Sequence, residues 1–255
     1  MGQADRVTSS EIYDETDAAR YDDENADVST PEVLDPMLDV LTQLAGDGPA
    51  LELASGTGRV AVPLAARGIE VTGIELSPHM TAKLYEKVPA DSLLVVQGDM
   101  ATTTAPGAGQ FSLVFLVFNT ISNLRTQAEQ VECFRNAARH LRPGGHFVVE
   151  LWVPQLQRMA PGMGLAPMHF DEGHLVFDTY DVATQECVSH HYRPSADGST
   201  RYGSGRFRYV WPAECDLMAQ LAGLELESRW ADWVGSTFTA GSTSHVSIWR
   251  KPNPS

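Results

Sequence analysis

The chain has 255 residues, 43% of them hydrophobic and 20% charged, a composition that fits an ordinary globular protein and excludes global disorder. Its 18 basic and 33 acidic residues give a net charge of −15, which disfavours nucleic acid and anionic membrane as partners and favours a neutral or cationic small molecule. The sequence opens without a basic region followed by an apolar run, and no apolar run has the length of a membrane span, so we expect a cytoplasmic protein.

Two thirds of the net negative charge lies in the first 40 residues, which carry 12 acids against two basic residues, a local balance of 2 − 12 = −10. We expect residues 1–35 to form an acidic arm with helical stretches, anchored by Tyr13 and Tyr21. Apolar residues then recur at helical spacing between positions 33 and 44, which predicts a helix that ends near Gly46.

Short apolar strands and amphipathic helices alternate from residue 50 to residue 152. The expected strands are 50–54, 70–75, 93–96, 111–118 and 146–152, and the expected helices are 58–68, 78–87 and 127–141. The fourth of these strands is almost entirely apolar, as in a parallel sheet that is covered on both faces. Such alternation predicts βαβ units with right-handed crossovers and a doubly wound parallel sheet.

The pattern changes after residue 152. Three β-rich segments, at 174–181, 186–193 and 201–211, are separated by turn residues and predict an antiparallel insert. A helix at 212–221 and two strands at 225–230 and 244–249 follow, and the two strands are compatible with a hairpin at the edge of the main sheet. We therefore predict an α/β fold with a seven-stranded, mostly parallel sheet, a core of residues 36–152 and 212–253, and an insert of residues 153–211.

A glycine-rich turn follows the first expected strand. Gly56 and Gly58 let the backbone turn tightly and let a ligand approach, while the next helix offers unpaired N–H groups. Gly56-x-Gly58-x-x-Ala61 also satisfies the fingerprint of dinucleotide-binding proteins, and Glu75 ends the next strand where a ribose partner is expected. A dinucleotide, another adenosyl cofactor and a purely structural turn all remain open at this point.

Three acidic residues in or just after the expected strands narrow the choice between these three interpretations of the glycine turn. Glu52 precedes the glycines, Glu75 leads into Leu76 and the next helix, and Asp99 follows the third strand. In this order the motifs resemble those of the class I S-adenosylmethionine-dependent methyltransferases, over about residues 36–152. One carboxylate can accept both hydroxyls of a ribose, and an acidic site suits a sulfonium better than a diphosphate.

The resemblance implies a role for each motif. The glycine turn would lie against the methionine part of S-adenosyl-L-methionine, Glu75 would bind the ribose, and Asp99 would bind the adenine amine with Met100 beside the ring. The N-terminal helix would close the site, with Arg20 meeting the methionine carboxylate. The expected cofactor-binding residues are Glu52, Ala54, Gly56, Thr57, Gly58, Glu75, Leu76, Met80, Asp99, Met100, Phe118, Tyr13, Arg20 and Tyr21.

The segment after the fourth strand and the β insert together are similar to the small-molecule branch of that family, which includes sugar N-methyltransferases and glycine N-methyltransferase-like enzymes. The insert would then form the acceptor pocket. The expected acceptor-binding residues are Asn119, Asn123, Trp152, Tyr192 and Tyr209. Asn123 stands where the sugar enzymes often carry His or Tyr, and an amide is no general base.

Catalytic groups are less well defined than the cofactor site. Asn123, His174 and His190 are the candidates, and the adjacent His190 and His191 must point to opposite faces of a strand. Neither the histidines nor the three cysteines have a metal-ligand spacing, so we expect no metal and no disulfide framework.

The sequence thus predicts a methyltransferase that transfers a methyl group from S-adenosyl-L-methionine to N or O of a small molecule, as a monomer or homodimer. An NAD(P)-dependent oxidoreductase is the first alternative, although no Tyr-x-x-x-Lys pair follows the fourth strand. The second alternative is a relative that binds the cofactor without methyl transfer, such as a cyclase or a binding protein.

Overall fold

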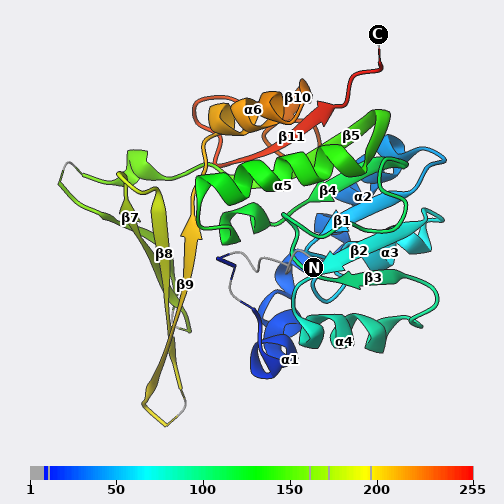
Figure 1. Cartoon of the computed structure of the whole chain (residues 1–255). Helices are drawn as coiled ribbons and strands as arrows, with labels where there is room; N and C mark the ends of the chain where they lie inside the picture. The colour runs from blue at the N-terminus through cyan, green and yellow to red at the C-terminus, as the bar shows by residue number, and fades with distance from the viewer. Residues whose placement is uncertain (1–8, 11, 161, 172, 196, 255) are drawn as a thin grey trace, which may run out of the picture.

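The computed structural model describes residues 9–10, 12–160, 162–171, 173–195 and 197–254. Seven strands form the main sheet in the spatial order β10-β11-β5-β4-β1-β2-β3 (Figure 1). In chain order these strands are β1 Ala50–Leu53, β2 Val71–Glu75, β3 Leu94–Gln97, β4 Phe111–Leu116, β5 Leu141–Trp152, β10 Glu225–Trp230 and β11 Ser244–Arg250. β11 runs antiparallel to both of its neighbours and the other pairs are parallel, which confirms the predicted α/β fold and its edge hairpin.

Helices cover both faces of this sheet. The helices of the core are α2 Pro31–Ala45, α3 Ala61–Ala66, α4 Pro78–Lys87, α5 Gln127–His140 and α6 Pro212–Leu221. Alternate residues of β4 belong to different cores, because Leu113 and Phe115 pack with α2 and α3 while Val114 and Leu116 pack with α5 and α6. Every residue of β4 is therefore buried, as its apolar sequence predicts.

Four further helical segments of the described residues lie outside this core scaffold or connect its strands. They are the α-helix α1 Glu15–Glu24 and the 3-10 turns η1 Asp27–Ser29, η2 Thr120–Asn123 and η3 Leu156–Arg158. Asp14 caps the N-terminus of α1, because its side chain accepts the N–H of Asp17, and α1 packs beside α4. No helix among the described residues is long and apolar enough to cross a membrane.

A second, antiparallel sheet stands to one side of the main body (Figure 1). Its strands are β6 Leu165–Phe170, β7 Leu175–Asp181, β8 Glu186–Pro194 and β9 Thr200–Arg208, in that spatial order. The sequence predicted three of them, with the last extending to residue 211. β6 was missed because Pro167 and a row of exposed side chains give it no alternating pattern, and its strand conformation comes from pairing with β7.

A second boundary also differs from the prediction. The helix expected at 127–141 ends at His140, and β5 already begins at Leu141 instead of at His146. Pro143 and two glycines hide this strand start from the sequence pattern, yet Leu141 pairs with Phe111 of β4 before the register shifts.

A buried arginine joins the second sheet to the main body. Arg208, at the end of β9, is 5% exposed and donates to Glu214 of α6 at 2.7 Å and to the side-chain oxygen of Gln185 at 2.6 Å. It also donates to Gln130 of α5, whose amide in turn donates to the carbonyl oxygen of Arg208 at 3.1 Å. The salt bridge between Arg208 and Glu214 is almost fully shielded from solvent, so removal of either partner would leave the other charge buried and unpaired.

We expect Arg208→Met to lower the free energy of unfolding by about 3–5 kcal/mol, because it leaves the Glu214 carboxylate without its cation in a buried place. The measurement is urea unfolding followed by circular dichroism. The matched control is Arg206→Met, which removes an exposed pair with Glu186 and costs at most about 1 kcal/mol. Equal unfolding midpoints for the two variants would contradict this prediction.

Candidate functional site

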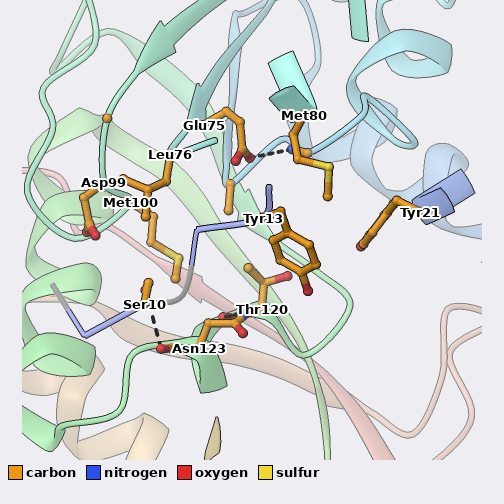
Figure 2. Close-up of a pocket in the computed structure, with 13 residues that line it drawn as sticks. Ser10, Tyr13, Tyr21, Glu75, Leu76, Met80, Asp99, Met100, Thr120 and Asn123 are labelled. Carbon is orange, nitrogen blue, oxygen red and sulfur yellow. Dashed lines mark hydrogen bonds between the residues drawn. The ribbon is translucent and has the colours of Figure 1, made fainter. Parts of the chain in front are cut away.

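A cavity of about 80 Å³ opens where the carboxyl ends of β1, β2 and β3 meet. Figure 2 shows side chains around this space from the N-terminal segment, from the end of β2, from the first turn of α4 and from η2. The lining residues are Ser10, Tyr13, Tyr21, Ala54, Gly56, Glu75, Leu76, Met80, Gly98, Asp99, Met100, Thr120 and Asn123. A second, smaller hollow shares Tyr21, Ala54, Gly56 and Thr120 with it and extends to Glu52, Thr57, Arg59 and Phe118.

The turn after β1 has the backbone conformation that the glycine pattern predicts. Ala54, Gly56 and Gly58 all have positive φ, at 57°, 55° and 82°. A side chain at Gly58 would also collide with Val62 and Leu84, at 2.8 and 2.9 Å, so glycine is required there for packing as well as for conformation. This turn brings backbone N–H groups to the edge of the cavity.

The carboxylate of Glu75 connects two segments of the site. Its Oε2 accepts the N–H of Gly56 at 2.7 Å, and its Oε1 accepts the N–H of Ser77 at 2.8 Å. Burial raises the pKa of Glu75, while these N–H groups favour the charged form. Each oxygen retains a lone pair, so the same carboxylate can still accept both hydroxyls of a diol in the cavity.

A flat, partly apolar slot lies next to Glu75. Leu76 and Met80 border it on the side of α4, and Asp99 and Met100 border it after β3 (Figure 2). Oδ1 of Asp99 accepts the N–H of Ala101 at 2.8 Å, which fixes the carboxylate at the cavity edge. Apolar walls with one acidic acceptor suit a heteroaromatic ring that carries an amine.

Glu52 lies in the second hollow and is 4% exposed. Among the described residues, none makes a hydrogen bond with its Oε2. Burial raises the pKa of Glu52 to about 8, and the positive charge of Arg59 opposes this shift only in part. A cationic ligand group such as an ammonium would lower this pKa and pair with the ionised carboxylate.

The N-terminal segment and α1 cover the cavity. Ser77 donates its hydroxyl to the carbonyl oxygen of Tyr13 at 2.6 Å, and the rings of Tyr13 and Tyr21 meet edge to face at 5.6 Å. Asp22 of α1 accepts the hydroxyl of Thr57 at 2.5 Å and forms a salt bridge with Lys87 at 2.6 Å. These contacts tie α1 to the glycine turn and to the end of α4.

The structure does not place Arg20 in the site. Its guanidinium lies on the exposed side of α1, 3.4 Å from Asp17 and 3.7 Å from Glu24, because both acids are one helical turn away. The cation at the second hollow is Arg59, which lies over the ring of Phe118 at 4.8 Å. Sequence analysis missed Arg59, whose place directly after Gly58 was the available signal.

The turn after β4 holds two consecutive residues in the left-handed region. Phe118 and Asn119 have φ values of 58° and 57°, each costing about 1–3 kcal/mol in a non-glycine residue. Glu150 stabilises this turn, since its carboxylate accepts the N–H of Phe118 at 2.8 Å and the indole N–H of Trp233 at 2.7 Å. The turn leads directly into η2, which lines the cavity.

The expected acceptor residues fall into two groups. Asn123 lines the cavity and donates its amide to Thr120, Asn119 accepts the N–H of Trp152, and Trp152 is 57% exposed beside the ring of Phe118. The others, Tyr192 and Tyr209, lie in or next to the second sheet, outside the lining of both hollows, as do the catalytic candidates His174 and His190.

Ser10 and Thr120 were also missed by sequence analysis. Ser10 donates to the carbonyl oxygen of Asn123 at 3.4 Å, a contact between segments 113 positions apart for which the sequence has no local signal. Within the described part of the chain, no three His, Cys, Asp or Glu side chains gather as metal ligands.

The chain is similar to known methyltransferases in sequence and structure. A family model described as "Methyltransferase domain" matches residues 50–145. The solved structure of the CcbJ methyltransferase from Streptomyces caelestis is 38% identical, with a TM-score of 0.78, and the match covers 94% of this chain and 100% of that one.

Curated relatives agree with this match. Cypemycin N-terminal methyltransferase from Streptomyces sp is 27% identical over 241 residues, which cover 91% of this chain and 94% of the relative. The dTDP-3-amino-3,4,6-trideoxy-alpha-D-glucopyranose N,N-dimethyltransferase from Streptomyces venezuelae is 32% identical over 102 residues, or 40% of this chain and 41% of the relative. Two other curated methyltransferases are matched over only 40% and 53% of their own lengths.

The raised pKa of Glu52 leads to a prediction about stability. The folded protein keeps this carboxyl protonated up to about pH 8, whereas the unfolded chain releases the proton near the ordinary value, so stability falls as pH rises between the two. From pH 5 to pH 8 the ligand-free protein should lose roughly 3 kcal/mol through this group. Glu52→Gln removes this loss.

The measurement is the free energy of unfolding in urea at a series of pH values. Glu225→Gln, a substitution of an exposed acid on β10, serves as the matched control and should follow the wild-type profile. If Glu52→Gln and wild type lose stability in parallel with rising pH, the buried protonated state of Glu52 is wrong.

Proposed function

Because the chain belongs to the class I S-adenosylmethionine-dependent methyltransferases, we propose that it methylates an amine nitrogen of a small molecule. The observation that carries this proposal is the cavity in which Glu75, Asp99 and the glycine turn face one another beneath α1. The comparisons support this activity and not hydride transfer or loss of methyl transfer. Residues 1–35 would act as the lid, residues 36–152 and 212–253 as the cofactor core, and residues 153–211 as the acceptor region.

The residues present fit the cofactor of this family. Glu75 would accept the ribose hydroxyls, and the slot beside Asp99 and Met100 would take the adenine. The orphaned, buried Oε2 of Glu52 fits the α-ammonium group of the methionine part, and Arg59 fits its carboxylate. When bound, S-adenosyl-L-methionine supplies a methyl group that is already activated by the positive charge on sulfur.

The chain itself contributes binding, orientation and exclusion of water. The strained turn at Phe118 and Asn119 fixes η2 beside the cavity, and the Tyr13–Tyr21 pair covers it from the other side. Positioning of this kind can supply several kcal/mol of the rate enhancement. The hydrogen-bonded amide of Asn123 can orient an acceptor but cannot remove a proton from it.

An amine acceptor is supported by charge and by the relatives. The net charge of −15 attracts cations, and most small amines are cationic at neutral pH. The two relatives described above are named for N-terminal and N,N-dimethyl transfer. A cytoplasmic location and a monomeric or homodimeric state belong to this proposal as well.

The proposal is tested by incubating the protein with methyl-labelled S-adenosyl-L-methionine and a panel of amines, phenols and amine-free sugars. We expect label in one or more amines, identified as N-methyl products by mass spectrometry. Label that appears only in hydroxyl compounds, or in no acceptor while the cofactor still binds, would overturn the proposal.

The cofactor site has its own prediction. Glu75→Gln should weaken S-adenosylhomocysteine binding by about 10- to 100-fold, because hydrogen bonds to a charged group contribute about 1.5–3 kcal/mol. Isothermal calorimetry measures this change. Glu70→Gln, which alters an exposed acid just before β2, is the control and should bind as wild type does. Unchanged affinity in Glu75→Gln would remove Glu75 from the ribose site.

A further inference from the structure

One face of the second sheet is turned towards the body that carries the cofactor cavity. We call it the inner face. Side chains at every second strand position share this face, and those used below are Asp178, Tyr180, Ser189, His191, Arg193, Arg201 and Phe207. Arg201 and Arg193 reach Glu24 of α1, at 2.9 and 4.0 Å. α1 also carries Tyr21 of the cavity lining, and η2, another lining element, packs against β9 (Figure 1).

A carboxylate on the inner face has an unused acceptor. Oδ1 of Asp178 is buried, and no described residue makes a hydrogen bond with it, whereas Oδ2 accepts the hydroxyl of Tyr180 at 3.2 Å. The thiol of Cys187, on the same face, is a second hydrogen-bonding neighbour of this carboxylate, yet Oδ1 stays unpaired, and an external donor would offset the cost of burying it. A cationic donor would offset this cost best.

Ser189 lies directly beside this carboxylate, because it is the cross-strand partner of Asp178 in the β7–β8 register. Its hydroxyl is 3.1 Å from Nε2 of His191. Nδ1 of His191 is in turn 3.0 Å from Nε2 of His174, and the two imidazoles stack with ring centres 5.1 Å apart. A chain of hydrogen-bonding groups therefore runs from Ser189 to His174, and it begins beside Asp178.

The surroundings disfavour the charged form of both imidazoles. Partial burial and the positive charge of Arg193 lower the pKa of both His174 and His191. The other titratable and charged groups around the pair are Glu24 from α1, Asp178 from β7, Arg201 from β9, and His169 with Asp171 at the end of β6, which contact each other at 2.7 Å.

The inner face also leaves room for a ligand. Gly203 of β9 pairs with His191, so no side chain of β9 stands beside that imidazole, whereas Gly205 pairs with Ser189 and the space there is taken by the ring of Phe207. A Cβ atom at Gly203 would meet nothing within 4 Å, whereas one at Gly205 would meet the ring of Phe207. Glycine inside a strand often marks such a close approach of a ligand.

We propose that Asp178, Ser189 and the His191–His174 pair form a subsite that binds the ammonium group of the acceptor and takes up its proton. This inference rests on the proposed amine methylation. The ammonium would bind between Oδ1 of Asp178 and the hydroxyl of Ser189, and one of its protons would pass through that hydroxyl to the imidazole pair. The freed nitrogen lone pair then forms the N–CH3 bond while the S–CH3 bond electrons go to sulfur, and the product leaves as a methylated ammonium.

His190 provides a matched control, since it is adjacent to His191 and lies on the opposite face. Its ring nitrogens contact Tyr202 at 2.8 Å and Thr179 at 3.2 Å, and its ring stacks on Phe177. Of the two histidines that sequence analysis proposed as catalytic candidates, the structure therefore favours His174 and turns His190 away from α1.

Binding of the cation is tested with benzylammonium chloride, whose ring can pack on Phe207 and Tyr180. Calorimetry at pH 7 on protein saturated with S-adenosylhomocysteine should show saturable binding. Asp178→Asn should weaken this binding by about 10- to 100-fold, because it keeps the shape but removes the charge. His190→Ala should bind as wild type does. Absence of saturable binding to wild type, or equal binding by Asp178→Asn, would overturn the subsite.

Proton uptake is tested by the pH dependence of methyl transfer to benzylamine, or to the fastest amine of the panel. At pH 6–7, His191→Asn and Ser189→Ala should lower kcat by about 100-fold relative to wild type and to His190→Ala. The difference should shrink as pH approaches the pKa of the free amine, because the acceptor then arrives already neutral. A difference that stays constant with pH indicates structural damage and overturns the proton-uptake role.

The binding experiment and the methyl-transfer experiment together separate this inference from the proposed function. A wild-type protein that binds S-adenosylhomocysteine but methylates no amine refutes the proposed function, whereas the benzylammonium measurement still decides whether the inner face is a cation subsite. Amine methylation that is insensitive to Asp178→Asn and His191→Asn refutes the inference alone.

Discussion

The buried carboxylate of Glu75 holds the cofactor edge of the main sheet in one arrangement. It stands at the end of β2, yet it accepts N–H groups from Gly56 in the turn after β1 and from Ser77 at the start of α4. The glycine turn and the next helix are thereby fixed relative to each other. Because burial disfavours a charged carboxylate, the same N–H groups offset the cost of keeping it there, and the remaining lone pairs point to a ligand with hydroxyl donors.

The second sheet depends on polar contacts more than on an apolar core. At one end, buried Arg208 connects β9 to α5 and α6, and at the other, Glu24 of α1 pairs with Arg201. The first contact is shielded and strong, while the second is exposed and screened by salt. The inner face is therefore anchored firmly near the core and weakly near α1, so that α1 connects the cavity to the second sheet.

Several departures from ordinary folding rules lie near the two proposed ligand regions. Ala54 and Phe118 hold strained backbone conformations at the ends of β1 and β4, and Glu52 and Asp178 each bury an oxygen that no described residue satisfies. Others lie away from these regions, since the buried Nε2 of His245 in β11 and the hydroxyl of Thr42 in α2 also have no hydrogen-bond partner among the described residues. Local costs of this kind are retained where a bound ligand can offset them.

The sequence by itself determined the parallel sheet, its edge hairpin and the acids at its strand ends, because periodicity, glycine turns and strand boundaries are properties of short segments. It could not show that Arg59 rather than Arg20 faces the site, since that choice depends on how α1 packs. It required His190 and His191 to point to opposite faces, but only the packing of the second sheet against α1 decided which face is the inner one. Strand register, twist and contacts between distant segments place side chains in space, and a local pattern does not encode them.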